Sequence, residues 1–268
     1  MRNYLLAFLL LSSLAVAQNS LADRLLVKLV EAEINLRVIG EFSENIVFLN
    51  RQTKDKNHFI YPAIISLKLV KENYSLKIIK EDKFLARDVV VLELKPNNRG
   101  PYWQFVIDKR TGSRLAYTQF SANNDILAEG SYSKIIKIIE RTNPRLIRNI
   151  ELEAKQKIFY RQIFAHLESP KGYIPVKIVS STIGRDKSPA LRISFFDGIN
   201  TLVLLLILND SKLPRNTETS QSIEINNHFL IAVGPVGKAA LVNWLESIKK
   251  TPLNNIKENE FKSFLRGL

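Results

Sequence analysis

The sequence predicts a mainly antiparallel β-protein of the α+β class, and two observations support this prediction. Apolar and polar residues alternate along residues 86–120, and turn-forming residues interrupt the alternation at short intervals. Apolar residues at helical spacing lie on either side of this region, within residues 21–34 and 241–248. The chain is therefore expected to combine paired strands with a helix near each end.

The stretch 86–120 contains three predicted strands. Residues 90–95 and 103–107 place apolar side chains at every second position, and residues 115–120 continue as a third strand. The intervening segments 96–101 and 108–112 contain Pro, Asn, Asp and Gly, which favour turns. Because short turns join antiparallel neighbours, we expect a three-stranded meander here.

The N-terminus has the features of a secretory signal peptide, which we assign to residues 1–17. Arg2 precedes an apolar run from Tyr4 to Val16, which is shorter than the roughly 20 residues that span a bilayer. Small residues at 15–17 form an A-x-A site, so cleavage is expected between Ala17 and Gln18. An uncleaved anchor is the alternative interpretation. Cleavage would release an exported chain.

Further elements on both sides of the meander complete the first half. Residues 21–34 have the pattern of a short amphipathic helix that packs across a sheet, with Asp23 placed to cap it. Polar residues at 54–57 and 71–73 favour turns. Strands are expected over residues 36–42, 46–49, 59–69 and 74–79, and residues 126–128 and 132–139 are expected to form one or two closing strands.

A break at Asn143-Pro144 divides the chain into two halves. We expect one domain over 18–150, a linker over 151–157 and a smaller domain over 158–268. The apolar run at 202–208 suits a fully buried strand, because it is too short to cross a membrane. A C-terminal helix is expected to bury one apolar face, formed by Leu241, Trp244, Leu245 and Ile248.

Composition narrows the classes of function. The chain of 268 residues has a net charge of +13 and no cysteine. Without cysteine it has no thiol nucleophile, cysteine-ligated zinc site or disulfide. The positive charge is spread along the chain, which suits anionic lipid headgroups, lipopolysaccharide or an acidic protein. Ordinary solubilising charge explains it equally well, and nucleic acid is not an expected partner of an exported chain.

Catalytic and metal-binding motifs are not evident in the sequence. The three histidines, His58, His166 and His228, lack partners at metal-ligand spacing. No G-x-S-x-G nucleophile motif is present. We therefore expect no catalytic residue, metal or cofactor, and a protein that is not an enzyme.

A family resemblance rests on the central stretch. Ala86-Arg87-Asp88, then Trp103, then the turn Asp108–Gly112 resemble a segment of the sigma-factor regulatory proteins RseB/MucB and, more distantly, of the lipoprotein carriers LolA and LolB. The second half contains further similar segments in the same order, at residues 171–175, 194–198 and 231–236. Because the carriers lack this second half, the resemblance favours RseB/MucB.

The resemblance implies a half-open β-barrel (LolA-like) domain followed by a smaller α+β domain. It also implies a periplasmic regulator that binds the outer segment of a membrane anti-sigma factor and shields it from proteolysis until envelope stress occurs. The barrel lumen would accept acyl chains or a lipopolysaccharide-like ligand, unless the first helix fills it; Arg87 or Arg99 would hold a headgroup. The residues expected to line the lumen are Val38, Phe42, Leu92, Leu94, Trp103, Phe105 and Ile107.

Two alternative functions remain open at this point. The first is a periplasmic lipid or lipoprotein carrier of LolA type, which would use the same lumen. The second is an envelope hydrolase without a motif that identifies it. Self-association into a homo-oligomer is also left open, because the sequence contains no feature that decides it.

Overall fold

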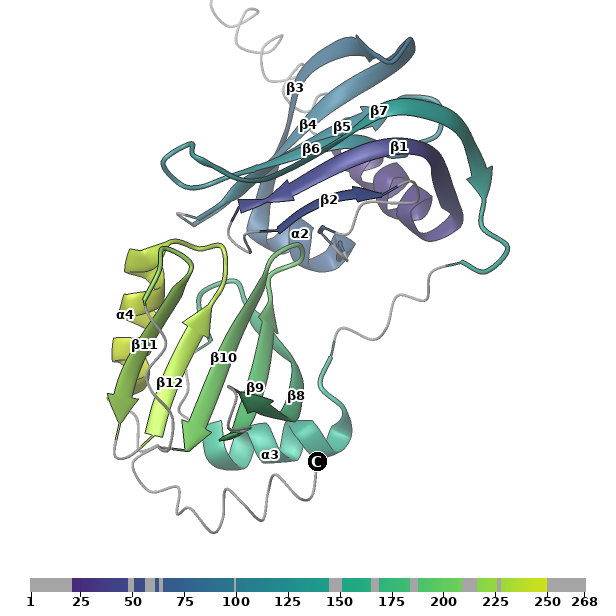
Figure 1. Cartoon of the computed structure of the whole chain (residues 1–268). Coiled ribbons are helices and arrows are strands. Elements are labelled where there is room, and N and C mark those ends of the chain that lie inside the picture. The colour runs from purple at the N-terminus through teal and green to yellow at the C-terminus, as the bar shows by residue number, and fades with distance from the viewer. Residues whose placement is uncertain are drawn as a thin grey trace, which may run out of the picture. The chain divides into compact units, whose positions relative to one another are not determined.

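The computed structural model describes residues 21–47, 51–55, 61–62, 65–98, 100–144, 151–164, 169–183, 188–208, 216–225 and 228–249. The chain divides into two compact units, Met1–Ile147 and Arg148–Leu268 (Figure 1). The predicted signal peptide at 1–17, His58, Arg99 and His166 lie outside the described residues. None of the described helices has the length and apolar character needed to span a membrane.

The first unit is built on a seven-stranded antiparallel sheet with the order β2-β1-β7-β6-β5-β4-β3 (Figure 1). Consecutive strands from β3 to β7 are neighbours, as expected for strands that are joined by short turns. The strands are β1 (Leu36–Ile46), β2 (Arg51–Asp55), β3 (Tyr74–Phe84), β4 (Arg87–Pro96), β5 (Tyr102–Asp108), β6 (Arg114–Phe120) and β7 (Ile126–Glu140).

The predicted meander corresponds to β4, β5 and β6. Leu92 lies opposite Phe105, and Phe105 lies opposite Tyr117, so these three side chains share one face of the sheet. All three are almost completely buried. The period-two pattern was informative because each of these strands has one fully buried face.

Residues 21–35 form the N-terminal helix, which packs on that face of the sheet. Its apolar stripe includes Leu26 and Leu29, which are fully buried. The Nζ atom of Lys28 donates to the carbonyl of Lys109 at 2.5 Å, and Glu33 forms a 3.0 Å ion pair with Arg114. These contacts attach the helix to the turn between β5 and β6 and to the beginning of β6.

Some predicted elements of the first unit are wrong. The strand expected over 59–69 overlaps a helix, α2 (Leu67–Asn73), which Ser66 caps at its N-terminus and which includes the expected turn at 71–73. The aliphatic residues around Leu69 and Val70 resemble a buried strand in sequence, although two turns of helix bury them equally well. Residues 51–55 form β2, so the expected turn at 54–57 begins too early.

The second unit contains a five-stranded antiparallel sheet with the order β11-β12-β10-β9-β8. Two described helices accompany it, α3 (Ala154–Phe164) and α4 (Lys238–Lys249). Because α3 begins at Ala154, the predicted linker 151–157 is partly helical. The strands are β8 (Ile174–Ile183), β9 (Ser188–Phe196), β10 (Thr201–Leu208), β11 (Ser220–Ile225) and β12 (His228–Val233).

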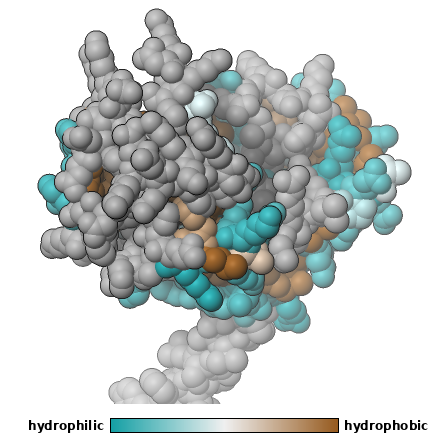
Figure 2. All heavy atoms as spheres, turned by 90° about the horizontal axis from the view of Figure 1, so that it is seen from below, coloured by the Kyte–Doolittle hydropathy of each residue, from teal (hydrophilic) through white to brown (hydrophobic). Residues whose placement is uncertain are grey.

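The C-terminal helix packs on the core of the second unit. Leu241, Trp244, Leu245 and Ile248 are all buried, as their helical spacing predicts. The Trp244 ring meets the Phe195 ring edge-on, with centroids 5.1 Å apart. Both units are mainly antiparallel β with helices, so the predicted α+β class is confirmed. On the face drawn in Figure 2, hydrophilic and hydrophobic areas of the described residues are interspersed.

Candidate functional site

The Asp108–Gly112 turn has a structural role. The Asp108 carboxylate accepts hydrogen bonds from the Thr111 N–H at 2.7 Å and the Thr111 hydroxyl at 2.9 Å, and it pairs with the Arg87 Nε at 2.6 Å. Burial alone would raise the pKa of Asp108, but these bonds to Thr111 and Arg87 lower it below its ordinary value. Arg87 is thus engaged in a partly buried ion pair, whereas the sequence suggested a role in holding a lipid headgroup.

Gly112 explains why this turn fits beneath the N-terminal helix. Its φ of +79° lies in the left-handed region, which favours glycine. A Cβ atom at this position would lie 2.6 Å from the Lys28 carbonyl oxygen and 2.6 Å from its Cγ. The turn therefore needs glycine both for its backbone conformation and for the close approach of the helix.

The residues expected to line a lumen all lie in the interior of the first unit. Leu92 and Leu94 on β4 pair with Phe105 and Trp103 on β5, as the register predicts. Ile107 belongs to the same face of β5. Val38 and Phe42 lie on β1, which is separated from β5 by β7 and β6. The exposed fractions of these side chains range from 0% to 9%.

A short segment, Tyr61-Pro62, covers part of this apolar face. The Tyr61 ring lies 5.1 Å from the Trp103 ring. The Tyr61 N–H donates to the Glu44 carboxylate at 3.0 Å, and the Tyr61 carbonyl accepts from the Arg114 guanidinium at 3.2 Å. Glu44 and Arg114 are both buried. Two buried charged side chains thus hold this segment against Trp103.

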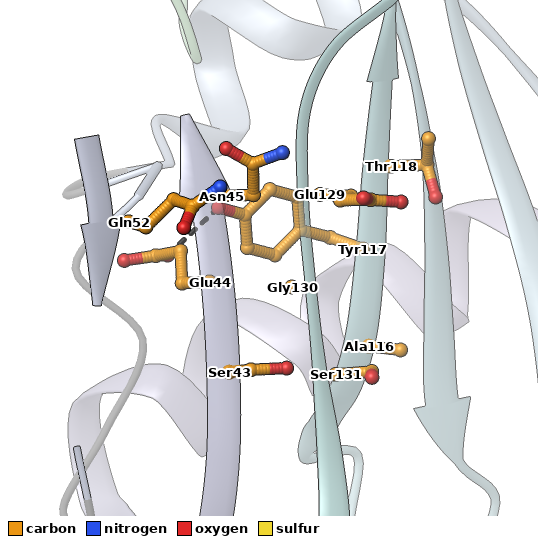
Figure 3. Close-up of a pocket in the computed structure, with 10 residues that line it drawn as sticks. All are labelled: Ser43, Glu44, Asn45, Gln52, Ala116, Tyr117, Thr118, Glu129, Gly130 and Ser131. Carbon is orange, nitrogen blue, oxygen red and sulfur yellow. Dashed lines mark hydrogen bonds between the residues drawn. The ribbon is translucent and has the colours of Figure 1, made fainter. Parts of the chain in front are cut away.

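A polar pocket of about 540 Å³ lies at the other end of the sheet, across β2, β1, β7 and β6 (Figure 3). None of the seven expected lumen residues lines it. The sequence did not reveal it because its residues are mostly polar and come from four different strands. The lining residues are Ser43, Glu44, Asn45, Gln52, Ala116, Tyr117, Thr118, Glu129, Gly130 and Ser131.

Strand register arranges these residues in three rows, which can be followed in Figure 3. The middle row, Tyr117-Gly130-Glu44, faces the same side as the buried lumen residues, because Tyr117 lies opposite Phe105. The two flanking rows face the opposite side, since successive side chains on a strand alternate. They are Ala116-Ser131-Ser43 and Thr118-Glu129-Asn45-Gln52.

The middle row contains a buried hydrogen bond. The Tyr117 hydroxyl donates to the Glu44 carboxylate at 2.7 Å, drawn as a dashed line in Figure 3. Gly130 stands between the two residues and has no side chain to separate them. Burial raises the pKa of the Tyr117 hydroxyl far above its ordinary value, and the charge of Glu44 raises it further. Tyr117 therefore acts as a permanent donor to Glu44.

A metal centre is not visible in the described part of the chain, where His, Asp and Glu do not gather in groups of three or more. His228 lies on β12. Asp108, Tyr117 and Glu44 are held by hydrogen bonds within the first unit.

Comparison with known proteins gives a result only at the level of structure. No family model matches the sequence, and no curated protein matches it. The complex of MucA and MucB from Pseudomonas aeruginosa matches with a TM-score of 0.57 and 11% identity, over 83% of this chain and 96% of that one. The chain has the fold of MucB.

Two further solved structures give the same result. MucB in complex with MucA(peri) matches at TM-score 0.53 and 11% identity, over 82% of this chain and 96% of that one. A structure of MucB alone matches at TM-score 0.54 and 12% identity, over 84% of this chain and 96% of that one. The RseB/MucB resemblance of the central motif is thus matched by the fold of most of the chain.

Proposed function

We propose that this chain is a periplasmic, non-enzymatic regulator that binds the outer segment of a membrane anti-sigma factor. The observation that carries the proposal is the extent of the fold match, which includes 96% of the MucB chain in its complex with MucA. In two of the similar structures MucB holds another protein, which favours a binding role over a catalytic one. The predicted signal peptide supports export.

Binding to the anti-sigma factor is tested with purified proteins. The mature chain from Gln18 is mixed with the periplasmic segment of each membrane anti-sigma factor that the same genome encodes. One segment is expected to co-elute with the chain in size-exclusion chromatography and to bind it in calorimetry. If the folded chain binds none of these segments, the proposed function is wrong.

The two compact units are proposed to be separate domains, with boundaries at 18–150 and 158–268. Limited proteolysis should then cut first between about residues 140 and 170, because domain joints expose backbone with few contacts. Two resistant fragments are expected by mass spectrometry. Early cuts within 86–120 would contradict this division, because that stretch forms three interior strands of the first sheet.

Lipid sensing is the finer part of the proposal, and a lipid carrier of LolA type is the alternative. Trp103 and its neighbours are buried, and Tyr61 of the segment Tyr61-Pro62 packs against the Trp103 ring. An acyl chain that enters here has to displace this segment, and it would bury roughly 0.8 kcal/mol per methylene in return. Binding is therefore expected to shift the environment of Trp103.

Fluorescence titration with acylated anionic lipids tests lipid entry. The chain has two tryptophans, so the signal is compared with that of Trp244→Phe, which retains Trp103 as the sole tryptophan. A saturable spectral shift in Trp244→Phe supports lipid entry. If neither the chain nor this variant responds and native mass spectrometry detects no bound lipid, the apolar face is an ordinary core. The anti-sigma binding proposal would be unaffected.

A further inference from the structure

The polar pocket of the first unit is independent of the function proposed above. Its volume of about 540 Å³ lies within the range of small-molecule sites, roughly 300–1,000 Å³. Its two flanking rows lie on the face of the sheet opposite to the side chains of Tyr117 and Trp103. A ligand there would occupy a site separate from the buried apolar face.

The shape of the pocket follows from the size of its side chains. The row Ala116-Ser131-Ser43 contains only short side chains, which leave a hollow over three neighbouring strands. The longer side chains of Asn45, Glu129 and Gln52 lie in the adjacent row. Hydroxyl, amide and carboxylate groups therefore line the hollow, and a polar ligand suits it better than an acyl chain does.

Charge in the pocket opposes the charge of the chain. The ten lining residues in the described structure include two carboxylates, Glu44 and Glu129, and neither Lys nor Arg, although the chain has a net charge of +13. Glu129 is exposed, and its carboxylate has no hydrogen-bond or ion-pair partner among the described residues. Glu44 is buried on the opposite face of β1, and its carboxylate adds negative charge on the far side of the sheet from Glu129.

We propose that this pocket binds a small organic cation, an aliphatic ammonium compound of the size of a short diamine. Glu129 forms the ion pair with one ammonium group. The side-chain oxygens of Asn45, Gln52 and Ser131 accept hydrogen bonds from the other N–H groups of the diamine, since each ammonium group offers three donors and no acceptor. An anionic ligand would find no positive side chain among the lining residues described here.

Calorimetry on the mature full-length chain tests this site with three probes that share a four-carbon skeleton. These are 1,4-diaminobutane, which is cationic, 1,4-butanediol, which is neutral, and succinate, which is anionic. Saturable binding of the diamine alone is expected. Equal binding of the diol, binding of succinate, or no binding of the diamine at millimolar concentration would each overturn the proposal.

Variants then locate the binding site. Glu129→Gln should weaken diamine binding at least about tenfold, because it removes a charge-assisted hydrogen bond. Ser131→Leu should abolish binding by filling the hollow. Glu140→Gln is the matched control, because Glu140 is also exposed on β7 and does not line the pocket. If Glu140→Gln weakens binding as much as Glu129→Gln does, the attraction is non-specific and the proposed site is wrong.

Discussion

Two tight turns of the same sheet differ in how well their residues suit their backbone. The Asp108–Gly112 turn joins β5 to β6, and its glycine supplies the positive φ. The turn between β3 and β4 consists of Leu85 and Ala86, which adopt φ values of +49° and +61° without a glycine. Two-residue turns with positive φ at both positions normally contain Asn-Gly or Asp-Gly.

The surroundings of the two turns explain this difference. The first turn lies under the N-terminal helix. Lys28 donates a hydrogen bond to the Lys109 carbonyl in this turn, and other Lys28 atoms occupy the position that a side chain at Gly112 would need. The second turn faces solvent, with Leu85 41% exposed. A misfit at the first turn would disturb the packing of the helix on the sheet, whereas a misfit at the second costs only local strain. The sequence requirement is therefore strict only where another element packs on the turn.

Gly112→Ala should have the largest effect. The left-handed φ costs a non-glycine residue about 1–2 kcal/mol, and the contact with the Lys28 carbonyl adds about 1–3 kcal/mol of overpacking. Chemical denaturation should show a loss of roughly 2–5 kcal/mol in the free energy of unfolding. Gly100→Ala is the control, because its Cβ would meet only the Pro96 Cγ, at 3.5 Å. Equal losses in both variants would show that the helix does not impose the requirement.

Asp108→Asn should have the next largest effect. It should lower the free energy of unfolding by about 1–3 kcal/mol at neutral pH, because it removes the charge that pairs with Arg87. The control is Asp88→Asn, whose ion pair with Lys83 is exposed and should contribute little. Denaturation at neutral pH compares the two variants. An equal loss in both would mean that burial does not strengthen the Asp108 pair.

The same variant tests the pKa of Asp108. The folded state lowers this pKa below its ordinary value of 3.8, so the ionised carboxylate stabilises the fold above that value. The contribution is lost as the pH falls further, through the folded pKa. The stability difference between wild type and Asp108→Asn should therefore be constant near neutral pH and shrink below about pH 4. A difference that shrinks between pH 7 and pH 5 would contradict the lowered pKa.

Lys28→Met should lower the free energy of unfolding by about 1 kcal/mol, because it removes the hydrogen bond to the Lys109 carbonyl. The aliphatic part of the side chain is retained. Lys71→Met serves as the control, since the ion pair of Lys71 with Asp23 is about half exposed. Thermal denaturation measures both variants. If Lys28→Met is neutral, the helix is held by its apolar stripe and the Glu33–Arg114 pair.

The elements predicted correctly from the sequence are those in which one face is buried along the whole element. The alternation around Trp103 and the helical spacing around Trp244 both follow from a single buried face. The helix α2 was missed because a helix of two turns buries only Leu69 and Val70, which is too little to show a period. Local pattern therefore predicts long elements better than short ones.

The pocket could not be predicted in the same way. Ser43, Glu129 and Ser131 come close only through the pairing of β7 with β1, which joins residues far apart in the chain. Their side chains are common on exposed strand faces, so composition gives no signal. The burial of Glu44 beside Tyr117 also depends on Gly130 between them, and no pattern within one strand contains that information.

Ala86→Gly should have the smallest effect and the opposite sign. Glycine relieves about 1–2 kcal/mol of left-handed strain, and the greater freedom of the unfolded chain takes back about 0.5–1 kcal/mol. A net gain of roughly 0–1.5 kcal/mol in the free energy of unfolding, with a midpoint of about 0.75 kcal/mol, is therefore expected from chemical denaturation.

The companion variant Leu85→Asn separates strain from sequence preference at this turn. Asparagine tolerates the left-handed region better than leucine, and Leu85 is exposed, so little apolar burial is lost. Both variants together should stabilise the chain by more than either alone. Destabilisation by Ala86→Gly would mean that Ala86 contributes contacts that outweigh its strain. Packing contacts would then constrain the exposed turn as well, and exposure would not explain why it lacks a glycine.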